Sequence, residues 1–124
     1  MAGGILQRLV LEIGRNIEVK TAGFSPGSSL APHAVEVMQE IGIDISSDAP
    51  KRITEDLVEW ADMIIPVCAG YGGELVDFFA EDRIEEKIRY LSRDIPDPFD
   101  GDRQCYRDCR DFLYEEIRKL LLDL

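Results

Sequence analysis

Positive charge is scarce in this sequence: 14 lysines and arginines stand against 25 aspartates and glutamates, which gives a formal net charge of −11. Sequence-independent binding to nucleic acid depends on cations that neutralise phosphates, so this balance argues against a nucleic-acid partner. The same deficit argues against attachment to anionic membrane surfaces. Long hydrophobic runs are also lacking, since a stretch such as residues 61–70 is too short to span a bilayer. The composition therefore excludes nucleic acid and membrane as expected partners.

Side chains that bind metals are few, because the chain has one histidine and three cysteines. Cys105 and Cys109 lie four apart on an expected helix, which would supply half of a metal site, but no second cysteine pair exists. Buried small apolar side chains are the favoured interpretation, and His33 is expected to be structural or solvated. No metal is predicted. The cysteine spacing and the lack of an export signal predict reduced thiols and a cytoplasmic location.

Apolar periodicity predicts a single α/β domain over residues 1–124, in which helices alternate with strands. Helices are expected at residues 5–13, 31–42, 54–61, 72–82 and 103–122, and strands at 17–24, 62–68 and 87–92. This alternation predicts a parallel sheet covered by helices on both faces, in three layers. The first helix has no strand to cross over from. We therefore expect the sheet to be incomplete at its first strand, which would come before residue 1.

A carboxylate follows the last expected strand. Asp97 lies between Pro96 and Pro98, and two prolines restrict the backbone on either side of it. Ligands of open parallel sheets bind beyond the carboxyl ends of the strands, where Asp97 could act as a general acid. On the residues alone, a solvated aspartate in a proline-stiffened turn is the favoured interpretation. The glycines of "AGYGG" after the middle strand are a weak phosphate-loop signal, and a plain strand-to-helix turn is favoured there.

None of the cysteines has the surroundings of a phosphatase nucleophile. A phosphocysteine mechanism needs an arginine for the phosphate oxygens, six residues after the cysteine (C-x5-R). The residues six positions after Cys68, Cys105 and Cys109 are Glu74, Asp111 and Glu115. All three are acidic where a phosphate needs a cation, so the C-x5-R loop is absent from these 124 residues.

Several segments in this order resemble the low-molecular-weight protein-tyrosine phosphatases, to which the arsenate reductases are related. They are "TAGF", "APHAVEVMQEIGIDIS", "ITEDLVEWADMII" and "DIPDPFDGDRQCYRDCRDFLYEEI", and they cover nearly the whole chain. The resemblance implies a flavodoxin-like parallel sheet and hydrolysis of phosphate monoesters through a phosphocysteine, without a cofactor. It also implies that the first strand and the phosphate loop come just before "MAGGIL", so that this chain begins after the nucleophile.

The resemblance assigns roles to two residues of the last loop. Asp97 matches the family's general acid, which protonates the leaving oxygen and later activates water, and Phe99 matches an aromatic wall of the substrate cleft. Three positions depart from the family pattern: Asp100 replaces an aromatic residue or glycine, Asp48 a histidine that supports the phosphate loop, and Lys51 a common arginine. The resemblance raises Asp97 above the turn interpretation as the acid, and it implies a phosphorylated protein or a small phosphate ester as partner.

Three functions follow from these observations. The chain is a phosphatase-family member that is inactive in this form, a non-catalytic binding or regulatory relative, or an arsenate-reductase-like protein whose cysteines are poorly spaced for a thiol relay. An incomplete sheet would expose strand edges that recruit a partner. We therefore expect residues 17–24 and 62–68 either to pair directly or to be bridged by a second copy, which would make a homodimer.

Overall fold

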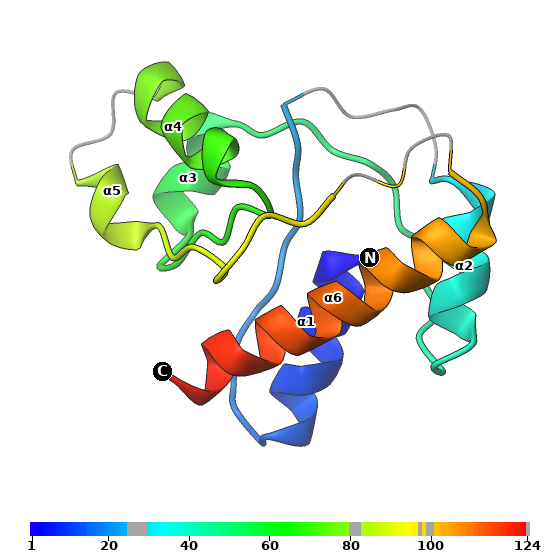
Figure 1. The fold of residues 1–124 in the computed structure, drawn as a ribbon. Helices are drawn as coiled ribbons and strands as arrows, with labels where there is room; N and C mark the ends of the chain where they lie inside the picture. Colours follow the sequence, from blue (N-terminus) through cyan, green and yellow to red (C-terminus); the bar gives the residue numbers. More distant parts are fainter. Residues whose placement is uncertain (25–29, 80–82, 97, 99–100, 124) are drawn as a thin grey trace.

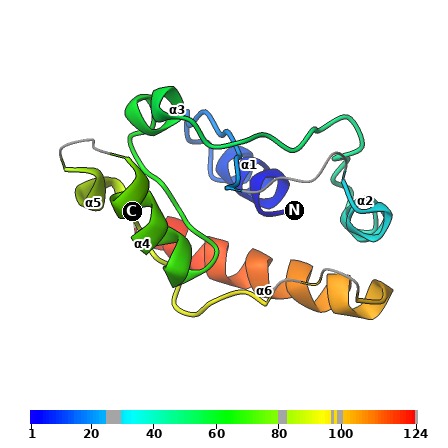
Figure 2. The same cartoon turned by 90° about the horizontal axis from the view of Figure 1, so that it is seen from above.

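A computed structural model of the chain describes residues 1–24, 30–79, 83–96, 98 and 101–123. Its helices are α1 (Ala2–Glu12), α2 (Pro32–Gln39), α3 (Glu55–Trp60), α4 (Ala69–Phe78), α5 (Ile84–Lys87) and α6 (Arg103–Leu122). The long helix α6 packs against α1 and α2, and α4 packs against α5 (Figure 1). Seen from above, α2 and the group α3–α5 lie toward opposite ends of α6 (Figure 2). None of the helices in these ranges is long and apolar enough to cross a membrane.

The helices begin and end where their sequences favour it. The side chain of Thr54 accepts a hydrogen bond from the backbone N–H of Leu57 at 3.2 Å, which caps α3. Asp102 caps α6 in the same way, because its side chain accepts a hydrogen bond from the backbone N–H of Cys105 at 2.9 Å. After α1 and α2, Gly14 and Gly42 adopt φ values of 69° and 78°, a left-handed conformation that suits glycine at a helix end. Helix α6 has the bounds that the sequence predicts, residues 103–122, so this expectation is confirmed.

The predicted parallel sheet is wrong for the described part of the chain, in which no residue belongs to a strand. Apart from Lys87, which ends α5, the expected strands lie outside the helices, and we call them the extended segments. Within the described residues they make only isolated parallel bridges, between Gly23 and Arg52 and between Ile64 and Ile88. A strand requires consecutive residue pairs along both segments, and here each pairing ends after a single pair of residues. Pro66 contributes to this result, because it has no N–H to donate within the middle segment.

The expected direct pairing of residues 17–24 with 62–68 is not observed among the described hydrogen bonds. The amide of Gly23 donates to Lys51 at 2.8 Å, and its carbonyl accepts from Ile53 at 2.9 Å. Ile64 bonds instead to the end of α5, since its amide donates to the Lys87 carbonyl at 2.9 Å. Each segment therefore has its own partner. As a result residues 17–24 stay largely exposed to solvent.

The described residues form two separate hydrophobic cores in place of one sheet-centred core. The first lies among α1, α2 and α6, where Ile5, Val37 and Met38 are fully buried. The second is smaller and lies among α3, α4 and α5; its buried members are Val58, Leu75, Ile84 and Ile88. The extended segments run between these cores. The loop that begins at Ser92 connects the second core to helix α6 of the first core.

Charged pairs fasten α6 onto α2. Arg107 and Arg110 both contact the Glu40 carboxylate, at 2.7 and 2.8 Å, and Arg110 also donates to the carbonyl of Val37 at 2.8 Å. The hydrogen bond from Arg107 is the main reason that the pKa of Glu40 falls from 4.5 to about 2. Arg103 extends the row through a 2.7 Å contact with Glu36. The start of α6 is thereby fixed just after the proline-rich loop.

Candidate active site

The carboxyl ends of the extended segments converge, as expected for a parallel arrangement. The amide of Ile95 donates to the Val67 carbonyl at 3.1 Å, and the Cys68 thiol donates to the Ile95 carbonyl at 3.4 Å. Phe24, at the end of the first extended segment, lies 6.2 Å from Tyr71 between ring centroids. The candidate site is therefore the region where these ends meet the loop of residues 92–98.

The carboxylate of Glu116 on α6 anchors the start of this loop. It accepts a hydrogen bond from the Ser92 amide at 3.1 Å and a short one from the Ser92 hydroxyl. The Glu116 side chain is only 2% exposed, and the Ser92 hydroxyl is the main cause of its lowered pKa. Arg93 adds a 3.7 Å contact to the same carboxylate and places its guanidinium 4.1 Å from the Phe112 ring centre.

The loop is held at two further points on its way to α6. Ile95 is 4% exposed and packs in the first hydrophobic core, so the middle of the loop is pinned as well as hydrogen-bonded. Beyond it, the amide of Gly101 donates to the Pro98 carbonyl at 2.8 Å, immediately before the Asp102 cap of α6. The chain on both sides of residue 97 is thus fixed by named contacts.

The residues expected to carry the chemistry, Asp97 and Phe99, lie outside the described residues, as does Asp100. Their described neighbours differ in environment, since Pro96 is exposed and Pro98 is half-buried. The roles of Asp97 and Phe99 therefore stay predictions. What the structure adds is the set of contacts that hold the loop on either side of them.

The cysteines occupy three different environments. Cys68 is a half-buried free thiol at the residue that precedes α4, Cys105 is an exposed free thiol, and Cys109 is buried in the first core. Cys105 and Cys109 therefore do not share a solvent-accessible site. Within the described ranges, no three His, Cys, Asp or Glu side chains gather as metal ligands.

His33, Asp48 and Lys51 lie outside the loop just described. The ring of His33 packs 5.7 Å from Tyr106 between centroids, and its Nδ1 lies 3.6 Å from Glu36 on the same helix. This packing agrees with a structural role. Asp48 and Lys51 are exposed, and the backbone carbonyl of Lys51 takes part in the bridge to residue 23.

Sequence reasoning did not identify Glu116 or Ser92. A signal for Glu116 was present, because it falls on the apolar stripe of α6 beside Leu113 and Ile117, where a carboxylate needs a buried partner. Ser92 carries no comparable signal. A serine in an exposed loop is too common to single out.

Comparison with known proteins now identifies the family. A family model described as low molecular weight phosphotyrosine protein phosphatase matches residues 1–124. The chain belongs to this family. Among curated relatives, the protein-arginine-phosphatase of Bacillus subtilis (strain 168) is 29% identical over 131 residues, covering 100% of this chain and 87% of the relative. An arsenate reductase from Halalkalibacterium halodurans is 36% identical over 56 residues, which is 45% of this chain and 40% of the relative.

Solved structures of the family have the same chain path. The low molecular weight protein tyrosine phosphatase from T. tengcongensis has a TM-score of 0.89 at 29% identity, covering 99% of this chain and 88% of that one. A YwlE mutant from Bacillus subtilis has a TM-score of 0.86 at 30% identity, covering 96% and 84%. This chain thus follows the path of these relatives, although its described extended segments form no strands.

Proposed function

We propose that this low-molecular-weight phosphatase carries the acid loop of the family site, with Asp97 as general acid and Phe99 as a wall of the substrate cleft, while its 124 residues alone hydrolyse no phosphate monoester. One observation supports the second half of the proposal. Each of the three cysteines is followed, six residues later, by an acidic side chain instead of the arginine that a phosphocysteine needs. Asp97 alone supplies neither the nucleophile nor the positive charge that stabilises a transferring phosphoryl group.

The environments of the cysteines agree with this proposal. In a complete site a thiolate attacks phosphorus, the bond to the leaving oxygen breaks as the acid protonates that oxygen, and water then cleaves the phosphorus–sulfur bond. The Cys68 thiol instead donates a hydrogen bond to the Ile95 carbonyl. Cys109 is buried in the first core.

For the full site, the substrate class that the comparisons favour is a phosphorylated protein, and phosphoarginine in particular, because the protein-arginine-phosphatases match the chain from end to end. No cofactor is proposed. The free thiols of Cys68 and Cys105 support a reducing, cytoplasmic environment, and we treat residues 1–124 as one domain.

A second candidate function is a non-catalytic binding relative of the phosphatases. The observation that favours it is the exposed aromatic side chains on α4, which need no nucleophile in order to bind a partner. An arsenate-reductase-like function has less support, since that match covers 45% of the chain.

The test is a direct assay of the purified chain with p-nitrophenyl phosphate and with phosphoarginine. We expect no phosphate release above the buffer rate and no phosphorylated adduct in the intact mass. Release that Cys68→Ser abolishes would show a nucleophile that the proposal denies. In that case Asp97→Asn should lower turnover while Asp123→Asn, a matched change at the end of α6, leaves it unchanged.

The mass of the protein from its native cells complements this assay. A mass equal to that of the 124 residues means that the cell makes the form without a C-x5-R loop. If the mass is larger, the assay and the Asp97→Asn variant are to be repeated with the longer form.

A further inference from the structure

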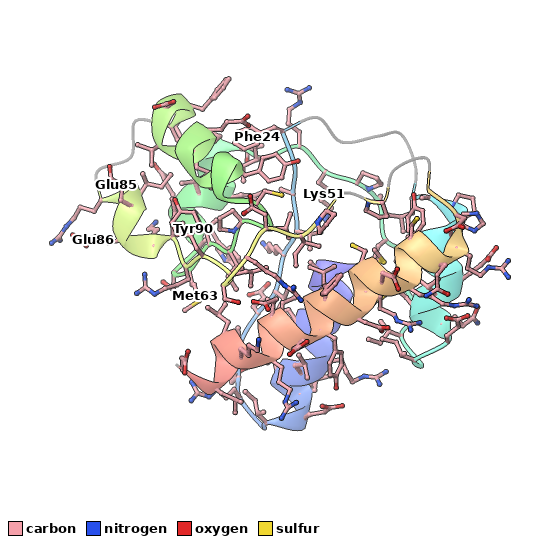
Figure 3. The ribbon with its side chains drawn as sticks, viewed as in Figure 1. Phe24, Lys51, Met63, Glu85, Glu86 and Tyr90 are labelled. Carbon is pink, nitrogen blue, oxygen red and sulfur yellow. The ribbon has the colours of Figure 1, made fainter. Side chains whose placement is uncertain are left out.

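The outer face of α4 exposes large aromatic side chains next to the end of the first extended segment. Phe78 is 74% exposed and Tyr71 is 42% exposed, although both are large and apolar. The ring of Phe24 lies 5.8 Å from Phe78 and 6.2 Å from Tyr71, so the three rings form one cluster (Figure 3, where Phe24 is labelled). We call these three residues the aromatic face. Clustered exposed apolar side chains of this kind mark interaction sites, whereas single ones need no explanation.

The α3–α4 side of the aromatic face is acidic. Residues 53–79, which form α3, α4 and the segment between them, contain six carboxylates and neither lysine nor arginine. All six are exposed: Glu55, Asp56, Glu59, Asp62, Glu74 and Asp77. Glu74 and Asp77 lie on α4 itself, within one turn of Tyr71 and Phe78. On the opposite side, Arg52 forms a backbone bridge with Gly23, the neighbour of Phe24, and Lys51 comes just before it. Lys20 lies 4.3 Å from the Trp60 ring centre, and Lys87 donates to the Val58 carbonyl.

We propose that the aromatic face binds a segment of a partner protein in which arginine or lysine lies beside an apolar side chain. The apolar side chain would cover the exposed rings. The cation would pair with Glu74 and Asp77 and make cation–π contacts with the rings. Aromatic side chains with a charged rim are the usual composition of such a docking site.

Charge decides between this occupant and the alternatives. A second copy would place the same acidic helix opposite itself, and like charges brought together across an interface oppose association. An anionic membrane surface would be repelled for the same reason. A basic segment is attracted by the field of the whole chain as well as by its near neighbours, since the net charge is −11.

The inference goes beyond the proposed catalytic function and does not depend on it, because binding on α4 needs no nucleophile. The two are nevertheless close in space. Tyr71 comes three residues after Cys68, whose thiol contacts the loop that leads to Asp97. A partner held on the aromatic face would therefore lie next to the candidate active site.

The experiment measures binding of a fluorescent peptide of alternating arginine and leucine to the intact chain by anisotropy. The peptide control replaces each arginine with glutamate. We expect Phe78→Ala to raise the Kd about tenfold, as loss of an anchoring aromatic does. The double change Glu74→Lys with Asp77→Lys should raise it by a similar factor and reduce its dependence on salt.

Two matched variants test whether the effect belongs to this face. Leu122 on α6 is 70% exposed, and Leu122→Ala should leave the Kd within about twofold. Glu12→Lys with Glu18→Lys makes the same charge change at exposed positions elsewhere, and it should also leave the Kd within about twofold. Phe78 is mostly exposed, so its alanine variant is expected to fold, and circular dichroism checks this.

Three outcomes would overturn the proposal. Equal loss of affinity in the two charge-changing variants would mean that only the net charge attracts the peptide. Equal affinity for the arginine and glutamate peptides, or no binding of either, would exclude a basic partner segment. A dimer seen by sedimentation that Phe78→Ala dissociates would assign the face to a second copy.

Discussion

Replacing Glu116 should loosen the loop that leads to Asp97. The Glu116 carboxylate is 2% exposed, and it accepts hydrogen bonds from both the amide and the hydroxyl of Ser92. A hydrogen bond to a charged group contributes about 1.5–3 kcal/mol, and Ser92 is exposed, so water can replace part of what it loses. We therefore expect Glu116→Gln to lower the free energy of unfolding by about 1–2 kcal/mol.

The assay is urea unfolding of a double-mutant cycle with Glu116→Gln and Ser92→Ala. If the two side chains act through each other, their single effects overlap, and the coupling free energy should be about 1 kcal/mol. Hydrogen exchange at the Ser92 amide should accelerate in Glu116→Gln, because its acceptor loses charge. The matched control is Glu115→Gln, whose carboxylate is 58% exposed, and we expect an effect within about 0.5 kcal/mol.

Additive effects of the two variants, within about 0.3 kcal/mol, would refute the anchoring role of Glu116. So would an unchanged exchange rate at Ser92. A change in the slope of unfolding free energy against urea would point instead to an altered denatured state, and the comparison would then use the exchange data alone.

Three further predictions concern the cores and the helices. Ile5→Ala should cost about 2–5 kcal/mol in urea unfolding, because Ile5 is fully buried in the first core. The pKa of Glu40 is lowered from 4.5 to about 2, so its contribution to stability should be present above pH 4.5 and be lost as pH falls toward 2; Glu40→Gln should flatten that decline in acid unfolding curves. Gly73→Ala on α4 has open space and should raise stability by up to about 1 kcal/mol, whereas Gly72→Ala should raise it less or lower it, because a methyl group there meets the ring of Tyr90; thermal unfolding of the pair checks both.

The sequence predicted helices well where their signals are local. The bounds of α6 agree with the expected 103–122, because Asp102 supplies a cap within the same segment and an apolar stripe continues along the helix. Helix α3 follows from Thr54 in the same way. Helix α4 begins at Ala69, three residues before the expected start at 72, because the glycines at 70, 72 and 73 are typical of a turn. The short α5 was assigned partly to a strand.

The sheet could not be predicted because a strand depends on its neighbours. Alternation in residues 17–24 and the apolar run at 62–68 predict strands, but they carry no information on the partner of either segment, and the described residues form no strand there. That information lies in residues distant along the chain, such as Lys51 for one and Lys87 for the other. The same reasoning applies to Glu116, whose partner Ser92 is 24 residues away. The local sequence pattern indicates the backbone conformation of a segment, whereas its hydrogen-bond partner depends on residues elsewhere in the chain.

The described part of the chain has no continuous ladder of backbone hydrogen bonds, and this affects the candidate site. In an ordered sheet, repeated backbone hydrogen bonds would fix the loop at a strand end. Here single contacts do so: Glu116 with Ser92 at the start of the loop, Val67 and Cys68 with Ile95 in its middle. Loss of any one contact removes a large part of the constraint, because no ladder of backbone hydrogen bonds among the described residues holds the same segment. The acid loop should therefore be more sensitive to substitutions on α6 than to changes in the extended segments, and the double-mutant cycle at Glu116 measures that dependence directly.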